Sequence, residues 1–205
     1  MVHFDLAVPA DLRFGAGRVS ELPQALAGLG ATQVLVVTGR VTSRADGIRS
    51  ALTEAGVSSV AFGVATEPSI DVVRAAVKMS AEAGCDAVLG FGGGSALDVA
   101  KAAAVLAATG ADPVDHLEVI GAGRPIVKPG LPCVAVPTTA GTGSEVTRNS
   151  VLSGSGVKAS LRSPLLLPKV AVVDPDLLIG LPRPTIAASG MDCLLYTSPS
   201  PRDRS

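Results

Sequence analysis

Three consecutive glycines, Gly92 to Gly94, join an apolar segment to an alanine-rich one and constrain the fold more than any other feature. Residues 87–91 read as a buried strand and 99–108 as a helix. Without Cβ atoms the turn can adopt positive φ and approach a ligand closely, while the first helical N–H groups stay unpaired. The pattern predicts an anion site suited to a pyrophosphate. A plain strand-to-helix connection without a ligand is the alternative, because short motifs have many false matches.

Further apolar runs read as strands, separated by helical stretches. The predicted strands are 33–38, 59–62, 87–91, 133–137 and 170–174. The helical stretches 19–29 and 44–55 are followed by Gly30 and Gly56, where a left-handed residue ends a helix, and Ser69 is a good N-cap for a third helix. This alternation predicts an α/β fold, with a Rossmann-like parallel sheet and flanking helices.

The rest of the chain is less regular. Residues 109–131 are rich in glycine and proline and read as a loop with a short helix near 114–119. Residues 147–152 and 157–161, separated by a glycine-bearing turn, predict a β-hairpin. The last residues, 197–205, have no apolar residue and no periodicity, which predicts a disordered tail. They also resemble translated adapter or vector sequence, which implies that the tail is not native.

Composition excludes several classes of partner. In 205 residues, 47% are hydrophobic and 2% aromatic, as in a core of close-packed aliphatic side chains. A net charge of −1 gives no electrostatic footprint for nucleic acid. The three cysteines form no CxxC pair, and no leader or membrane-spanning run is evident, so we expect a cytoplasmic protein that binds neither nucleic acid nor membrane.

A second motif follows the apolar run 133–137. The segment 137–147 is dense in threonine, serine and glycine. Hydroxyl groups at the carboxyl end of a strand can bond a ribose or a phosphate without adding charge. The alternative for this segment alone is a polar loop that uses its hydroxyl groups for local turns.

Together, 92–101 and 137–147 resemble the iron-containing (group III) alcohol dehydrogenase family, which includes maleylacetate reductases. Supporting matches occur at Phe14-Gly15-Ala16-Gly17, Ser163-Pro164, Pro168-Lys169-Val170 and Val173-Asp174-Pro175-Asp176-Leu177. The resemblance covers residues 4–192 and implies an oxidoreductase that interconverts an alcohol and an aldehyde or ketone by hydride transfer. A kinase or NTPase is disfavoured, because no Gly-Lys-Ser/Thr follows the glycine turn.

The resemblance implies a set of cofactor-binding residues. These are Gly39, Gly93, Gly94, Ser95, Asp98, Thr138, Thr139, Thr147 and Lys158. Gly93, Gly94 and Ser95 would contact the pyrophosphate, and Lys158 would reach a ribose hydroxyl. Asp98 is expected to be a first-turn acid that favours the helix dipole or orients the loop, or else simply stabilises the helix.

The resemblance implies NAD or NADP as the cofactor. Many NAD-preferring members of the family carry an aspartate where this chain has Gly39 followed by Arg40. Without that carboxylate a 2′-phosphate is not repelled, and Arg40 could pair with it, so NADP is permitted. A simply solvated arginine is the alternative.

The resemblance also implies a divalent metal, iron or zinc, held by one aspartate and three histidines and acting as a Lewis acid. Asp192 matches the first ligand, but the position four residues on is Tyr196, and the histidines, His3 and His116, match no ligand position. We therefore expect no metal in this chain and assign it no catalytic residue.

The expected organisation is a dinucleotide-binding domain over 1–182, the start of a helical metal-binding domain over 183–195 and the tail over 196–205. The chain would be an inactive cofactor-binding half of a homo-oligomeric enzyme. A non-catalytic nucleotide-binding module and a fragment of a maleylacetate reductase-like enzyme are the alternatives.

Overall fold

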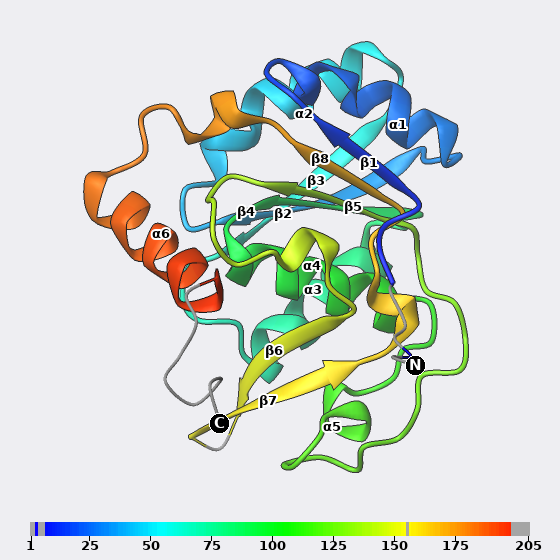
Figure 1. Ribbon diagram of the computed structural model, residues 1–205. Coiled ribbons are helices and arrows are strands. Elements are labelled where there is room, and N and C mark those ends of the chain that lie inside the picture. Colours follow the sequence, from blue (N-terminus) through cyan, green and yellow to red (C-terminus); the bar gives the residue numbers. More distant parts are fainter. Residues whose placement is uncertain (1–2, 4–6, 155, 198–205) are drawn as a thin grey trace.

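The computed structural model describes residues 3, 7–154 and 156–197, and its centre is a six-stranded parallel sheet (Figure 1). The strands lie in the order β1-β8-β5-β4-β2-β3. Their bounds are β1 Asp11–Phe14, β2 Gln33–Gly39, β3 Ser58–Val64, β4 Ala87–Gly92, β5 Cys133–Pro137 and β8 Val170–Val173. The order β3-β2-β4-β5-β8 is that of a flavodoxin-like doubly wound sheet, so the winding reverses between β2 and β4.

Helices cover both faces of the sheet (Figure 1). The helices are α1 Leu22–Gly28, α2 Asp46–Glu54, α3 Ile70–Glu82, α4 Gly94–Ala107, α5 Pro113–His116 and α6 Arg183–Thr197. α1 and α2 pack on one face, and α3 and α4 on the other, so one hydrophobic cluster forms on each side. None of the described helices is both long and apolar enough to cross a bilayer.

A hairpin of β6 Asn149–Gly154 and β7 Val157–Arg162 lies beneath α4, on the side away from the sheet (Figure 1). Short 3-10 turns complete the fold, namely η1 Arg18–Glu21, η2 Thr42–Ala45, η3 Ser144–Val146, η4 Pro164–Leu166 and η5 Pro175–Leu178. α6 follows the α/β unit and continues through Tyr196 and Thr197, which the sequence analysis had assigned to the tail. Residues 198–205 lie outside the described residues.

The predicted fold class is confirmed, together with each predicted strand, the hairpin and the helix ends. Gly30 and Gly56 have φ of 77° and 80°, and Ser69 caps α3 by accepting a hydrogen bond from Val72 N. β1 was not predicted from the sequence; its four residues pair with β8 at the sheet edge. The start of α4 was predicted too late, since helical structure begins at Gly94.

The glycine turn serves close packing and not positive φ, which corrects our expectation for Gly92 to Gly94. A Cβ on Gly90 would lie 2.9 Å from Ala100 Cβ, and one on Gly92 would lie 2.7 Å from Ala96 Cβ. Because real Cβ atoms do not approach so closely, these glycines let α4 lie directly against β4. This packing brings the start of α4 to the carboxyl edge of the sheet.

Candidate functional site

The N-terminus of α4 lies beside the point where the winding of the sheet reverses. Gly93 is the N-cap residue in an extended conformation, with φ −76° and ψ −178°, and no side chain caps the helix. The first N–H groups of this 14-residue helix are therefore available to a ligand. In open α/β sheets, ligands bind at the carboxyl ends of the strands at such a switch point.

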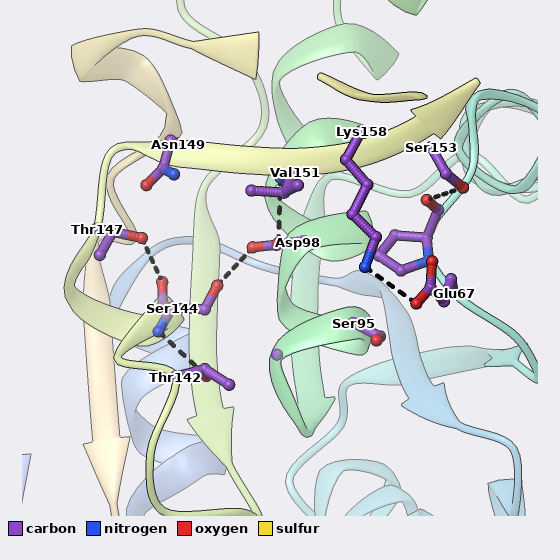
Figure 2. A pocket seen from close by; sticks show the side chains of 12 residues that line it. Glu67, Ser95, Asp98, Thr142, Ser144, Thr147, Asn149, Val151, Ser153 and Lys158 are labelled. Atoms are coloured by element: carbon purple, nitrogen blue, oxygen red, sulfur yellow. Dashed lines mark hydrogen bonds and ion pairs between the residues drawn. The ribbon is translucent and has the colours of Figure 1, made fainter. Parts of the chain in front are cut away.

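Two pockets flank this helix start. The first, the switch-point pocket, has a volume of about 220 Å³ and is lined by Thr38, Gly39, Arg40, Arg44, Gly93 and Thr139, among others. The second, the hairpin pocket, has a volume of about 390 Å³ and is lined by Gly94, Ser95, Asp98, Thr147, Val151 and Lys158, among others (Figure 2). The glycine turn separates the two, so an extended ligand that fills both would cross the helix N-terminus.

The structure brings all nine expected cofactor-binding residues to these pockets. Gly39, Gly93, Thr138 and Thr139 line the switch-point pocket. Gly94, Ser95, Asp98, Thr147 and Lys158 line the hairpin pocket. Residues up to 119 positions apart in the sequence therefore surround one helix terminus (39 to 158). Their individual contacts with a ligand remain predictions.

Asp98 lies in the second turn of α4, so the expectation of a first-turn acid is wrong. Its carboxylate accepts hydrogen bonds from Ser144 Oγ at 2.6 Å and from Val151 N at 3.1 Å (Figure 2). The helix begins four residues before Asp98 because the glycine turn is shorter than expected, and this places the carboxylate opposite the hairpin. Asp98 thus holds the threonine-rich loop and β6 against α4.

Lys101, whose side chain is 0% exposed, was not predicted as a site residue. Its Nζ donates to Ser144 O at 2.8 Å and to Asn149 O at 2.5 Å, and lies 3.2 Å from Asp98 Oδ1. Burial lowers the pKa of Lys101, and the Asp98 carboxylate opposes that shift. The available signal was a lysine in the alanine-rich stretch 99–108, three residues after an aspartate.

Lys158 extends from β7 toward Glu67, with the charged atoms 3.0 Å apart (Figure 2). Both side chains are about 65% exposed. Exposed ion pairs contribute about 0–1 kcal/mol, so the ammonium group can exchange Glu67 for a ligand hydroxyl at little cost. The geometry is compatible with the expected ribose contact.

The described residues do not fit a metal centre. Asp192 is exposed on α6, and His116 lies in α5, where its Nδ1 is 2.8 Å from Arg124 O. Among the described residues no group of three or more histidine, cysteine, aspartate or glutamate side chains could hold a metal ion.

Comparison with known proteins identifies the family. The sequence pattern of the family described as iron-containing alcohol dehydrogenase matches residues 9–175. The chain is 40% identical over 186 residues to long-chain-alcohol dehydrogenase 1 of Geobacillus thermodenitrificans, covering 89% of this chain and 47% of that protein. It is 35% identical over 195 residues to the NAD-dependent methanol dehydrogenase of Bacillus methanolicus, covering 92% and 50%.

Solved structures agree with the sequence relatives. A 1,3-propanediol oxidoreductase aligns with a TM-score of 0.86 at 34% identity, covering 94% of this chain and 51% of that one. Sulfoacetaldehyde reductase from Bifidobacterium kashiwanohense, solved in complex with NAD+, aligns with a TM-score of 0.84 at 34% identity, covering 94% and 51%. The chain spans about half the length of the relatives it matches. The chain belongs to the iron-containing alcohol dehydrogenase family.

Proposed function

We propose that this chain is the dinucleotide-binding part of an NAD(P)-dependent alcohol dehydrogenase. The observation that carries the proposal is the uncapped N-terminus of α4 at the switch point, with a pocket on either side. An N-terminus of this kind attracts a pyrophosphate through its free N–H groups and its dipole. The NAD-dependent and NAD+-bound relatives support a nicotinamide cofactor.

In this arrangement the pyrophosphate lies over Gly93, Gly94 and Ser95, and the two nucleoside halves enter the two pockets. Thr138 and Thr139 supply hydroxyl groups on one side, and Thr147 and Lys158 supply a hydroxyl and an ammonium group on the other. These groups would hold the riboses while α4 holds the charge of the pyrophosphate.

The reaction proposed for the enzyme is the interconversion of a small alcohol and its aldehyde or ketone. When bound, the nicotinamide cofactor would supply the acceptor for the hydride of the alcohol carbon, and the hydroxyl proton would be released to solvent. The residues of this chain bind and orient the cofactor. We propose that the chain does not turn over substrate by itself, because Asp192 is one carboxylate whereas a catalytic zinc site generally has three protein ligands.

We further propose a homo-oligomeric enzyme in the cytoplasm. Leu12 and Phe14, on the edge strand β1, are 54% and 72% exposed, which supports a contact between subunits. Cys85 and Cys133 carry thiols and not disulfides, as is usual in a reducing compartment.

Titration with NADH and NADPH, followed by the fluorescence of the reduced nicotinamide, tests the proposal. Gly94→Val should weaken binding by about 2 kcal/mol, roughly thirtyfold, because the side chain would occupy the site of the pyrophosphate. A Cβ on Gly94 would also lie 2.9 Å from Thr142 Cγ2, so Gly94→Val/Thr142→Ala is the matched variant that relieves this contact. Affinity restored in the double variant, or no binding by the unmodified chain, would contradict the proposal.

A further inference from the structure

The switch-point pocket contains two arginines and no carboxylate. Arg40 directly follows β2, and Arg44 lies at the end of η2, and both line the pocket beside Gly39. None of the residues that line the pocket is aspartate or glutamate. The pocket therefore has the charge of an anion site and lies directly beside the N-terminus of α4.

Neither guanidinium group has a side-chain partner in the part of the chain that the structure describes. Within residues 3, 7–154 and 156–197, Arg40 and Arg44 form no ion pair and donate no side-chain hydrogen bond. The nearby Arg49, on α2, instead bonds Ser59 Oγ at 3.3 Å and lies 3.8 Å from Asp46. Two guanidinium groups that have no partner among the described residues can both bind one dianionic ligand in this pocket. Arginine binds phosphate through parallel hydrogen bonds.

Gly39 provides the space next to these arginines. A Cβ on Gly39 would meet no atom within 4 Å, and its φ is not positive. In dinucleotide-binding folds, an acidic residue near this edge accepts a hydrogen bond from the ribose 2′-hydroxyl in NAD sites, whereas an arginine accommodates the 2′-phosphate in NADP sites. In this chain Gly39 stands where the acidic residue would be, and two arginines, Arg40 and Arg44, line the pocket instead of one.

We propose that the switch-point pocket binds the 2′-phosphate of NADP(H) through Arg40 and Arg44, so that the chain prefers NADP(H) to NAD(H). The inference rests on the proposed function, because it requires the pyrophosphate to lie at the N-terminus of α4. From there, the adenosine ribose reaches the carboxyl end of β2, where both arginines lie. The preference distinguishes this chain from relatives named for NAD.

Competing titrations of the full chain test the inference. NADPH should bind at least tenfold more tightly than NADH, and adenosine 2′,5′-bisphosphate should bind at least tenfold more tightly than 5′-AMP. The NADPH preference should fall as salt is raised, because the pocket is open to solvent. Inorganic phosphate serves as the probe for a free anion and should compete only weakly.

Variants assign the preference to residues. Arg40→Ala and Arg44→Ala should each lose about tenfold in NADPH affinity with little change for NADH, and Arg40→Lys should recover part of the loss. Arg49→Ala is the matched control, since it removes the same charge outside the pocket and should leave the ratio unchanged. Gly39→Asp should reverse the preference, whereas the nearly isosteric Gly39→Asn should not.

The outcomes separate the inference from the proposed function. Binding of NADH with equal or greater affinity than NADPH overturns the inference and leaves the dinucleotide site standing. Absence of binding for both cofactors overturns the proposed function and the inference with it. Tight NADPH binding by the double variant Arg40→Ala/Arg44→Ala would show that another group binds the 2′-phosphate, and this result also overturns the inference.

Discussion

Replacement of Lys101 by methionine should destabilise the fold strongly, although the two side chains have similar length. The change removes the donor to Ser144 O and Asn149 O and leaves the Asp98 carboxylate, 15% exposed, without its cation. Removing one partner of a buried ion pair costs about 3–5 kcal/mol. We take the lower end, about 3 kcal/mol, because Asp98 keeps its bonds from Ser144 Oγ and Val151 N.

Urea unfolding followed by far-ultraviolet circular dichroism measures the effect. For a chain of this size, about 3 kcal/mol corresponds to a lowering of Tm by roughly 6–12 °C and a fall of about 1 M in the urea midpoint. Lys78→Met is the matched control, because Lys78 is 76% exposed and lies 3.8 Å from Glu82. It should change the stability by less than about 0.5 kcal/mol.

A double variant tests the reasoning. If the uncompensated carboxylate is the main cost, Asp98→Asn/Lys101→Met should be more stable than Lys101→Met alone, since no buried charge then remains. A Lys101→Met protein within about 1 kcal/mol of the unmodified chain would refute the account. So would a double variant whose loss equals the sum of the two single losses, because contacting residues should couple.

Two further predictions concern titratable groups. Burial alone would raise the pKa of Asp86, but hydrogen bonds from Thr32 and Gln33 hold it below its ordinary value of 3.8. Its stabilising contribution should be complete above that value and lost as the pH falls through the lower folded-state pKa, whereas Asp86→Asn should flatten the acid limb of a plot of unfolding free energy against pH. Burial raises the pKa of Cys133 to about 12, so a thiol reagent should label Cys133 only as fast as the protein opens, and rapid labelling at neutral pH in native buffer would contradict its burial.

The sequence predicted the elements whose signals are local. The strand at 33–38 contains the continuous apolar run 34–37, and Gly30 and Gly56 mark helix ends because only glycine adopts the left-handed conformation without strain. β1 was missed because its four residues are stabilised as a strand by β8, which lies more than 150 residues away in the sequence (14 to 170). Pairing of that kind leaves no pattern within so short a segment.

The residues that line the candidate site were predicted from the sequence, but the contacts among them were not. The glycine and threonine segments follow β4 and β5, and parallel strands bring their carboxyl ends to one edge. Lys101 donates to backbone carbonyls that lie 43 and 48 residues away in the sequence. Contacts of this kind cannot be predicted from a pattern of side chains. The two pockets likewise depend on how α4, the hairpin and α6 pack together.

The placement of α6 has a mechanical consequence. Thr185 and the preceding Leu181 and Pro182 form one wall of the switch-point pocket, and the backbone of α6 at Ser189 lies so close to Gly141 that a Cβ there would overlap the Ser189 carbonyl. α6 therefore contacts both the switch-point pocket, through Thr185, and the threonine-rich loop, through Ser189. A ligand that displaced Thr185 outward would have to carry Ser189 away from Gly141 as well, because both residues belong to one helix.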